Sequence, residues 1–167
     1  FDTVVLRHRE LAVPRGIERY RLRLVDAFPS EREGIDRYIR YLYEQQAFGN
    51  AMNRPSRLLR AALRSRLLFR WANRTVGAFL DTCTRDPELR AVLCAEAGDY
   101  AEPPSRASLA LHAGLMLHYL EDGGFYPAGG GQVMSDRLAE SIEVSGGKIL
   151  LSTHVERILV ENGRATG

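Results

Sequence analysis

Lysine is nearly missing from this chain of 167 residues, since Lys148 is the one lysine among 23 basic residues. Cysteine is scarce as well: Cys83 and Cys94 stand apart, without a C-x-x-C pair or a histidine at ligand spacing. The scarcity predicts no metal site and fits a reducing intracellular setting, with a single disulfide as the alternative. No apolar run approaches the roughly 18 to 20 residues that span a bilayer, and no signal peptide is visible. We therefore expect a cytoplasmic protein.

An initiator methionine is also missing, because the chain opens at Phe1 and runs at once into the strand-like "FDTVVL". It closes on "RILVENGRATG", where a second strand should start after a hairpin turn. Its composition, 45% hydrophobic and 26% charged, suits a folded domain with a core. We expect an internal piece of a longer protein.

Acidic residues are absent from the stretch 54–74, which carries seven arginines, Arg54, Arg57, Arg60, Arg64, Arg66, Arg70 and Arg74. Arg57, Arg60 and Arg64 follow i, i+3, i+7 spacing and share one helix face. This pattern is typical of a basic amphipathic helix that docks on anionic lipid, which predicts peripheral contact with a membrane. The alternative is a solvated face, or one paired with acids elsewhere in a longer protein. No recognition motif supports nucleic-acid binding.

Helical patterns fill most of the chain before residue 121. Ser30 with Glu33 has the spacing of a capping box, Pro55 suits a first helical turn, and Ser105 is a candidate N-cap. We expect a strand over 1–6 and helices over 17–28, 30–46, 87–93 and 105–120. We also expect a helix that runs from 55 toward 71 and a short turn of helix over 76–80.

After residue 121 the pattern changes. Glycines at 129–131 predict a turn, 133–144 predicts a helix that ends at Gly146, and "KILLST" and "VERILVE" predict strands. Asn162-Gly163 is a strong hairpin signal. The whole therefore predicts a mostly helical α+β fold. Exposed strands of this kind could also pair between chains and form a dimer.

The glycine-rich "GGFYPAGGGQVMSDRLAE" at 123–140 lacks both familiar phosphate-loop spacings, G-x-G-x-x-G and G-K-[ST]. Taken alone, it predicts only a tight turn with positive φ. Its neighbours add more, because 126–167 resembles the middle of flavin-dependent amine-oxidase-type oxidoreductases, in the phytoene desaturase, carotenoid isomerase and retinol saturase branch. The shared positions are Tyr126, Pro127, Gly129, Gly130, Gly146, Gly147, Val155, Ile158, Gly163, Arg164, Ala165 and Gly167. Upstream, "RYRLRLVDAFPSEREGIDRYIRYL" and "RDPELRAVLCAEAGDYAEPPSRASLALHAGLMLHYL" are similar to the helical substrate region of that branch.

The resemblance implies a cofactor and a division of the chain. The family binds FAD, mainly through an N-terminal G-x-G-x-x-G and a C-terminal Gly-Asp segment, neither of which lies within 1–167. Residues 1–121 would be the helical substrate region and 122–167 the segment that returns to the FAD-binding domain. The main chain of Val155 would contact the cofactor, while Tyr126, Gly129, Gly130 and Gln132 would line the substrate cavity.

The implied activity is hydride transfer between flavin and an apolar, polyene-like small molecule, in a bacterial enzyme of which this chain alone is inactive. Such chemistry needs few titratable groups, which suits a sequence without a Ser/His/Asp arrangement, and it leaves the catalytic residues unknown. His112 and His118 lie six residues apart, on different helix faces, so we expect no shared metal. The alternative is a non-catalytic helical module that binds anionic lipid or a partner protein through its arginine-rich helix.

Overall fold

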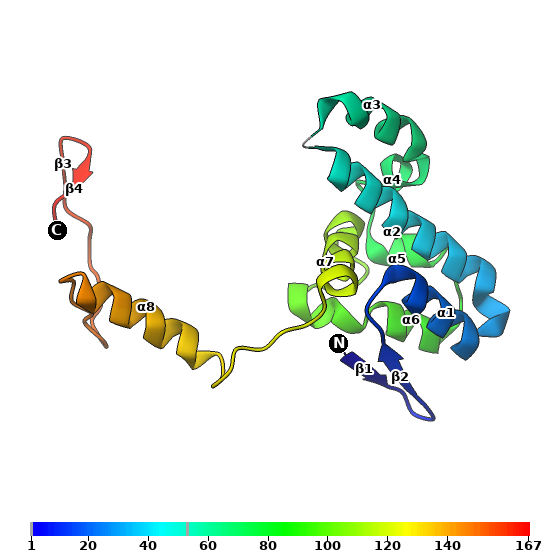
Figure 1. Ribbon diagram of the computed structural model, residues 1–167, viewed down its shortest axis with the longest axis horizontal. Coiled ribbons are helices and arrows are strands. Elements are labelled where there is room, and N and C mark those ends of the chain that lie inside the picture. The colour runs from blue at the N-terminus through cyan, green and yellow to red at the C-terminus, as the bar shows by residue number, and fades with distance from the viewer. Residues whose placement is uncertain (1, 53) are drawn as a thin grey trace. The chain divides into compact units, whose positions relative to one another are not determined.

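The computed structural model describes residues 2–52 and 54–167, so Phe1 of the predicted first strand lies outside the described residues. The chain divides into a first unit that ends at Gly124 and a second unit, Phe125–Gly167 (Figure 1). The first unit is helical with one small hairpin, and the second contains one helix and a shorter hairpin. The predicted mostly helical α+β fold is confirmed.

A β-hairpin opens the first unit, with β1 (Asp2–Val5) antiparallel to β2 (Glu10–Val13). Strand β2 was not predicted from the sequence, although Leu11 and Val13 alternate toward the core in the way a half-buried strand requires. Gly16, at φ 101°, then turns the chain into α1 (Ile17–Ala27), which is the helix that the periodicity predicted.

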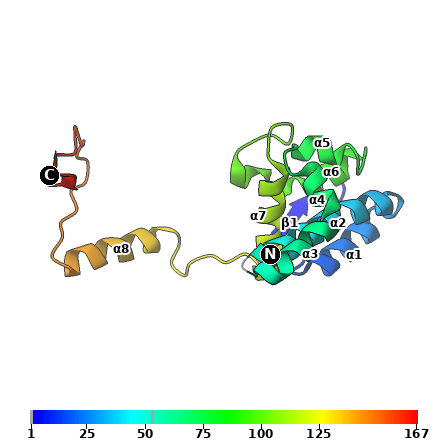
Figure 2. The ribbon, with the colours of Figure 1, turned by 90° about the horizontal axis from the view of Figure 1, so that it is seen from above.

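The long helix α2 (Arg32–Met52) follows a 3-10 turn, η1 (Pro29–Glu31), and runs through the middle of the first unit (Figures 1 and 2). Ser30 lies inside that turn, so the predicted capping box at Ser30 is wrong. Helices α1, α3, α4 and α7 all contact α2. It can pack against all four because it buries apolar side chains around much of its circumference, among them Ile35, Tyr38, Ile39, Tyr41 and Leu42.

The helix expected from residue 55 toward 71 is two helices, α3 (Pro55–Arg64) and α4 (Arg66–Trp71), because Ser65 breaks it. Ser65 is buried, leaves helical geometry at ψ 48°, and donates its hydroxyl to the carbonyl of Ala61 at 2.8 Å. A serine that bonds its own backbone in this way competes with helix continuation. The carboxylate of Glu44 on α2 accepts the backbone N–H of Leu68 at 2.9 Å and fixes the first turn of α4.

The next segment contains α5 (Val76–Leu80), α6 (Pro87–Leu93), a 3-10 turn η2 (Ala95–Tyr100) and α7 (Leu109–Asp122). Asp86 caps α6 by accepting the N–H groups of Glu88 and Leu89. The cap of α7 is Ser108, so the prediction of Ser105 is wrong. A β-bridge between Thr75 and Ser108 holds this segment, which delays the start of the helix by three residues.

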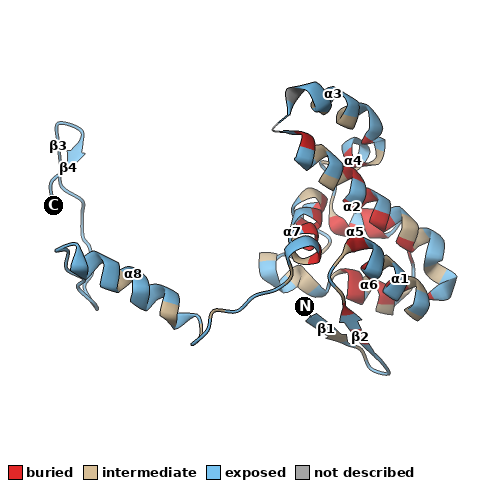
Figure 3. Cartoon of the chain, in the orientation of Figure 1, coloured by how far each residue is buried: buried red, intermediate tan, exposed pale blue. Residues whose placement is uncertain are grey.

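The second unit contains α8 (Gln132–Val144), close to the predicted 133–144, and a hairpin of β3 (Val160–Glu161) with β4 (Arg164–Ala165). The Asn162-Gly163 turn is confirmed, with positive φ at both residues. The strand predicted at "KILLST" (148–153) is wrong, and of the strand predicted at "VERILVE" (155–161) only Val160–Glu161 forms. The main chain of Leu159 still bonds to Thr166 and Gly167, but a strand needs a partner for its backbone groups, and no described segment pairs with 148–158. Among the described residues of this unit none is buried (Figure 3).

Two glycines on α2 test the packing of the first unit in opposite directions. A Cβ added at Gly34 would collide with the backbone carbonyl of Cys83, whereas a Cβ at Gly49 meets nothing within 4 Å. Gly34→Ala should therefore lower the free energy of unfolding by about 2 kcal/mol or more. Gly49→Ala should raise it by roughly 0.5–1 kcal/mol, because alanine favours helix. Urea unfolding followed by circular dichroism measures both, and shifts of the same sign would contradict the close contact of α2 with Cys83.

Candidate functional site

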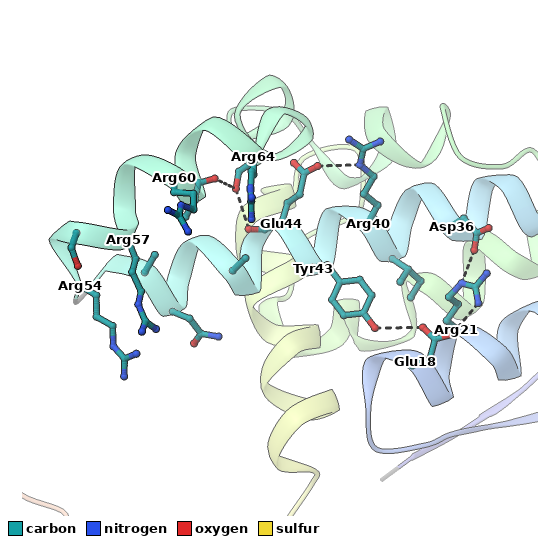
Figure 4. Close-up of a pocket in the computed structure, with 17 residues that line it drawn as sticks. Glu18, Arg21, Asp36, Arg40, Tyr43, Glu44, Arg54, Arg57, Arg60 and Arg64 are labelled. Carbon is teal, nitrogen blue, oxygen red and sulfur yellow. Dashed lines mark hydrogen bonds and ion pairs between the residues drawn. The ribbon is translucent and has the colours of Figure 1, made fainter.

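A hollow of about 1200 Å³ lies between α2 and α3, with residues of α1 at its far end (Figure 4). Two helices that contact each other closely leave this space because small residues stand at their facing positions, including Ala47 and Ala51 on α2 and Ala61 on α3. The lining is mixed, with arginines, three carboxylates and short apolar side chains.

One end of the hollow is strongly cationic. Its arginines come from the start of α3 and from one face of that helix, Arg54, Arg57, Arg60 and Arg64 (Figure 4). The structure thus brings together the three residues for which a shared face was predicted, and it adds Arg54. In the described part of the chain, none of the four side chains has a hydrogen bond or an ion pair. Their charge is therefore unneutralised by neighbours.

The other end contains carboxylates that are already paired. Arg21 donates to Asp36 at 2.6 Å and to Glu18 at 3.0 Å, and these hydrogen bonds raise the pKa of its guanidinium. Arg40 donates to Glu44 at 3.1 Å. Glu44 is nearly buried, and its second oxygen accepts the N–H of Leu68. The acids of the hollow are therefore satisfied without the arginines of α3.

A buried polar chain in the core of the first unit was not anticipated. His112 on α7 is fully buried, with Nε2 at 2.9 Å from the hydroxyl of Tyr38 and Nδ1 at 3.2 Å from that of Tyr100. A neutral imidazole has one donor and one acceptor nitrogen, so one tyrosine donates to the ring and the other accepts from it. The sequence signal was present, because His112 shares the apolar face of α7 with Leu109, Met116 and Leu120.

The predicted cofactor and cavity residues all lie in the second unit. Tyr126 is exposed, and Gly129 and Gly130 have φ near +90°, as a tight turn requires. Gln132 opens α8 and donates its side-chain amide to Asp136 at 3.0 Å. Val155 is 70% exposed in a segment without regular structure. The described residues of this unit do not by themselves form a flavin pocket, so a cofactor would need further protein around it.

The described residues contain no group of three or more histidine, cysteine, aspartate or glutamate side chains placed to hold a metal ion. None of their helices has both the length and the apolar character to cross a membrane.

Comparison with known proteins gives a family. The chain is 30% identical over 178 residues to the all-trans-retinol 13,14-reductase of Danio rerio, a match that covers 98% of this chain and 29% of that protein. The protein of the same name from Homo sapiens is 27% identical over 184 residues, covering 100% of this chain and 30% of its own length. Prolycopene isomerase 1 of an Oncidium hybrid cultivar is 24% identical over 167 residues, covering 94% and 28%.

The chain belongs to the phytoene desaturase, carotenoid isomerase and retinol saturase branch. The resemblance inferred from the sequence is thereby confirmed. The chain spans about three tenths of the length of the curated relatives it matches. No protein-family model matches it, and no solved structure does.

Because His112 is buried, the stability of the folded chain depends on pH. Burial lowers the pKa of His112 to about 4, below the value of about 6.5 for a histidine in an unfolded chain. The unfolded state therefore binds the extra proton first. This pKa difference contributes about 3 kcal/mol to the free energy of unfolding. The contribution is complete above about pH 6.5 and is lost as the pH falls toward 4.

His112→Gln, which cannot titrate, should flatten that dependence between pH 7 and pH 4. The measurement is the urea midpoint at a series of pH values. His118→Gln is the matched control, because it changes an exposed ring beside Asp122 on the same helix. An unchanged pH profile in His112→Gln would show that another group causes the acid sensitivity.

Proposed function

We propose that the protein is a FAD-dependent oxidoreductase that moves a hydride between flavin and an apolar, polyene-like substrate. The observation that carries this proposal is the alignment of almost the whole chain with an all-trans-retinol 13,14-reductase at 30% identity. The names of the relatives specify a reductase acting on all-trans-retinol and an isomerase of prolycopene. Both substrates are conjugated and largely apolar, so the shared requirement is a dry, apolar site.

The chemistry of the described residues is compatible with this role. Flavin, when bound, accepts or supplies the hydride, and the protein's task is to orient the substrate and to exclude water. His112 is not available as a proton carrier for a substrate, because both ring nitrogens are bonded to tyrosines inside the core. We assign it a structural role.

We infer a division of labour along the chain. Residues 1–121 would form the substrate region and 122–167 would return to the FAD-binding domain. The support is that the second unit lacks a core: Leu138 and Ile142 lie one turn apart on α8 and are both exposed. An amphipathic helix of this kind requires an apolar partner surface. We propose that the cofactor domain supplies it, with Tyr126, Gly129, Gly130 and Gln132 lining the adjacent substrate cavity.

Val155 offers a direct test of the cofactor assignment, because the proposed contact is made by its backbone. In the described chain its N–H has no hydrogen-bond partner, so proline at this position removes the proposed bond to FAD without breaking a backbone bond within the chain. Val155→Pro in the full-length protein should weaken FAD binding roughly five- to tenfold through one lost hydrogen bond. Val155→Ala keeps the N–H and should bind FAD normally.

The flavin-to-protein absorbance ratio and titration of the apoprotein with FAD measure both variants. Equal affinity of Val155→Pro and Val155→Ala would remove Val155 from the cofactor site. A full-length protein that purifies without flavin and takes up none would overturn the oxidoreductase proposal itself.

A further inference from the structure

We propose that α3 docks on an anionic lipid surface, with headgroup phosphates held by the arginines of the α2–α3 hollow and Leu59 and Leu63 inserted beyond them. Nothing in this inference depends on flavin or on a redox reaction. It combines two features of the same short helix, an unpaired cationic face and an unpaired apolar face.

The cationic face is matched to phosphate. Arg57, Arg60 and Arg64 lie along one side of α3, and Arg54 precedes its first turn, so the four guanidinium groups border a single open space (Figure 4). Guanidinium binds phosphate oxygens through paired hydrogen bonds, and it does so best where no carboxylate competes. The carboxylates of the hollow are held by Arg21, Arg40 and Leu68, and residues 45–80 contain no acid. An anion supplied from outside is the missing partner.

The apolar face indicates where that anion is. Leu59 and Leu63 are one turn apart on α3, away from the arginines that line the hollow, and are 72% and 68% exposed. Two leucines on one exposed face require an apolar phase, and each would gain roughly tenfold in binding by leaving water. Arginines behind inserted leucines lie at the depth of the headgroups in an interfacial helix. The lipid interface supplies the phosphate and the apolar phase together.

Other occupants explain only half of the surface. A free phosphorylated molecule would use the hollow and leave the leucines in water. A nucleic acid supplies phosphates and no apolar phase. The bilayer interface is therefore the occupant that both faces select.

The test is co-sedimentation of the full-length protein with vesicles of phosphatidylcholine alone or mixed with phosphatidylglycerol. Binding should require the anionic lipid and weaken as salt rises. The triple variant Arg57→Gln, Arg60→Gln, Arg64→Gln should bind the mixed vesicles roughly a hundredfold less tightly, at about fivefold per arginine. A matched control removes the same charge from the same acid-free stretch outside the hollow: Arg66→Gln, Arg70→Gln, Arg74→Gln. It should retain most of the binding.

The leucines are tested separately. Leu59→Gln with Leu63→Gln should lower binding to the mixed vesicles by tenfold or more, whereas Leu22→Gln, a change of an exposed leucine on α1, should not. Because these positions are exposed, the variants should fold, and their circular dichroism should match the parent.

Three results would overturn the proposal. Equal binding to neutral and anionic vesicles would remove the role of charge, and equal losses in the two arginine triples would reduce it to nonspecific attraction. Thermal stabilisation by glycerol phosphate that disappears in Arg57→Gln, without any vesicle binding, would assign the hollow to a soluble anion. All of these variants should retain their flavin. That result would show that a loss of vesicle binding is independent of the proposed FAD-dependent function.

Discussion

The hydrogen-bonded chain from Tyr38 through His112 to Tyr100 is the contact on which the first unit depends. It joins α2, α7 and η2 inside the core, both ring nitrogens are paired, and burial favours the neutral form of the imidazole. Aromatic packing extends it, with Tyr41 of α2 against Phe79 at 5.0 Å. Because α2 is fixed on this side, its remaining sides offer defined surfaces to α1, α3 and α4.

The charge distribution in the hollow follows from how Glu44 is held. Glu44 is held near the core by Arg40 and Leu68, so it determines where α4 begins and where the chain turns after α3. The same bonds remove Glu44 as a partner for the arginines of α3. A stabilising contact at one end of the hollow thereby leaves an unneutralised cationic surface at the other end. In the proposed enzyme this surface and the leucines of α3 would bring the protein to the membrane in which apolar polyenes dissolve.

The second unit differs from the first because it forms a helix and a hairpin without a core. Its helix and hairpin are specified by local signals, yet it buries none of its described residues. A polypeptide that forms elements without a core has its packing surfaces still free, as expected of a segment that completes a larger domain. Membership in the retinol saturase and carotenoid isomerase branch is consistent with such a role.

The sequence by itself determined the features that neighbouring residues specify: the periodicity of α1, the aspartate cap of α6, α8 with its terminal glycine, the Asn162-Gly163 hairpin and the branch to which the chain belongs. The structural signals among these act over a few residues, and the contacts of the folded chain agree with them. Tertiary structure decided the cap at Ser108 instead of Ser105, the burial of His112, the start of α4 and the loss of strands over 148–158. The distant partners are Thr75 for Ser108, Tyr38 for His112 and Glu44 for Leu68, and the strands lack a partner strand in the described residues. The break at Ser65 combines the bond of Glu44 with the local bond from Ser65 to Ala61. Hydrogen bonding of buried or extended backbone is a long-range requirement, and a local pattern cannot reveal whether it is met.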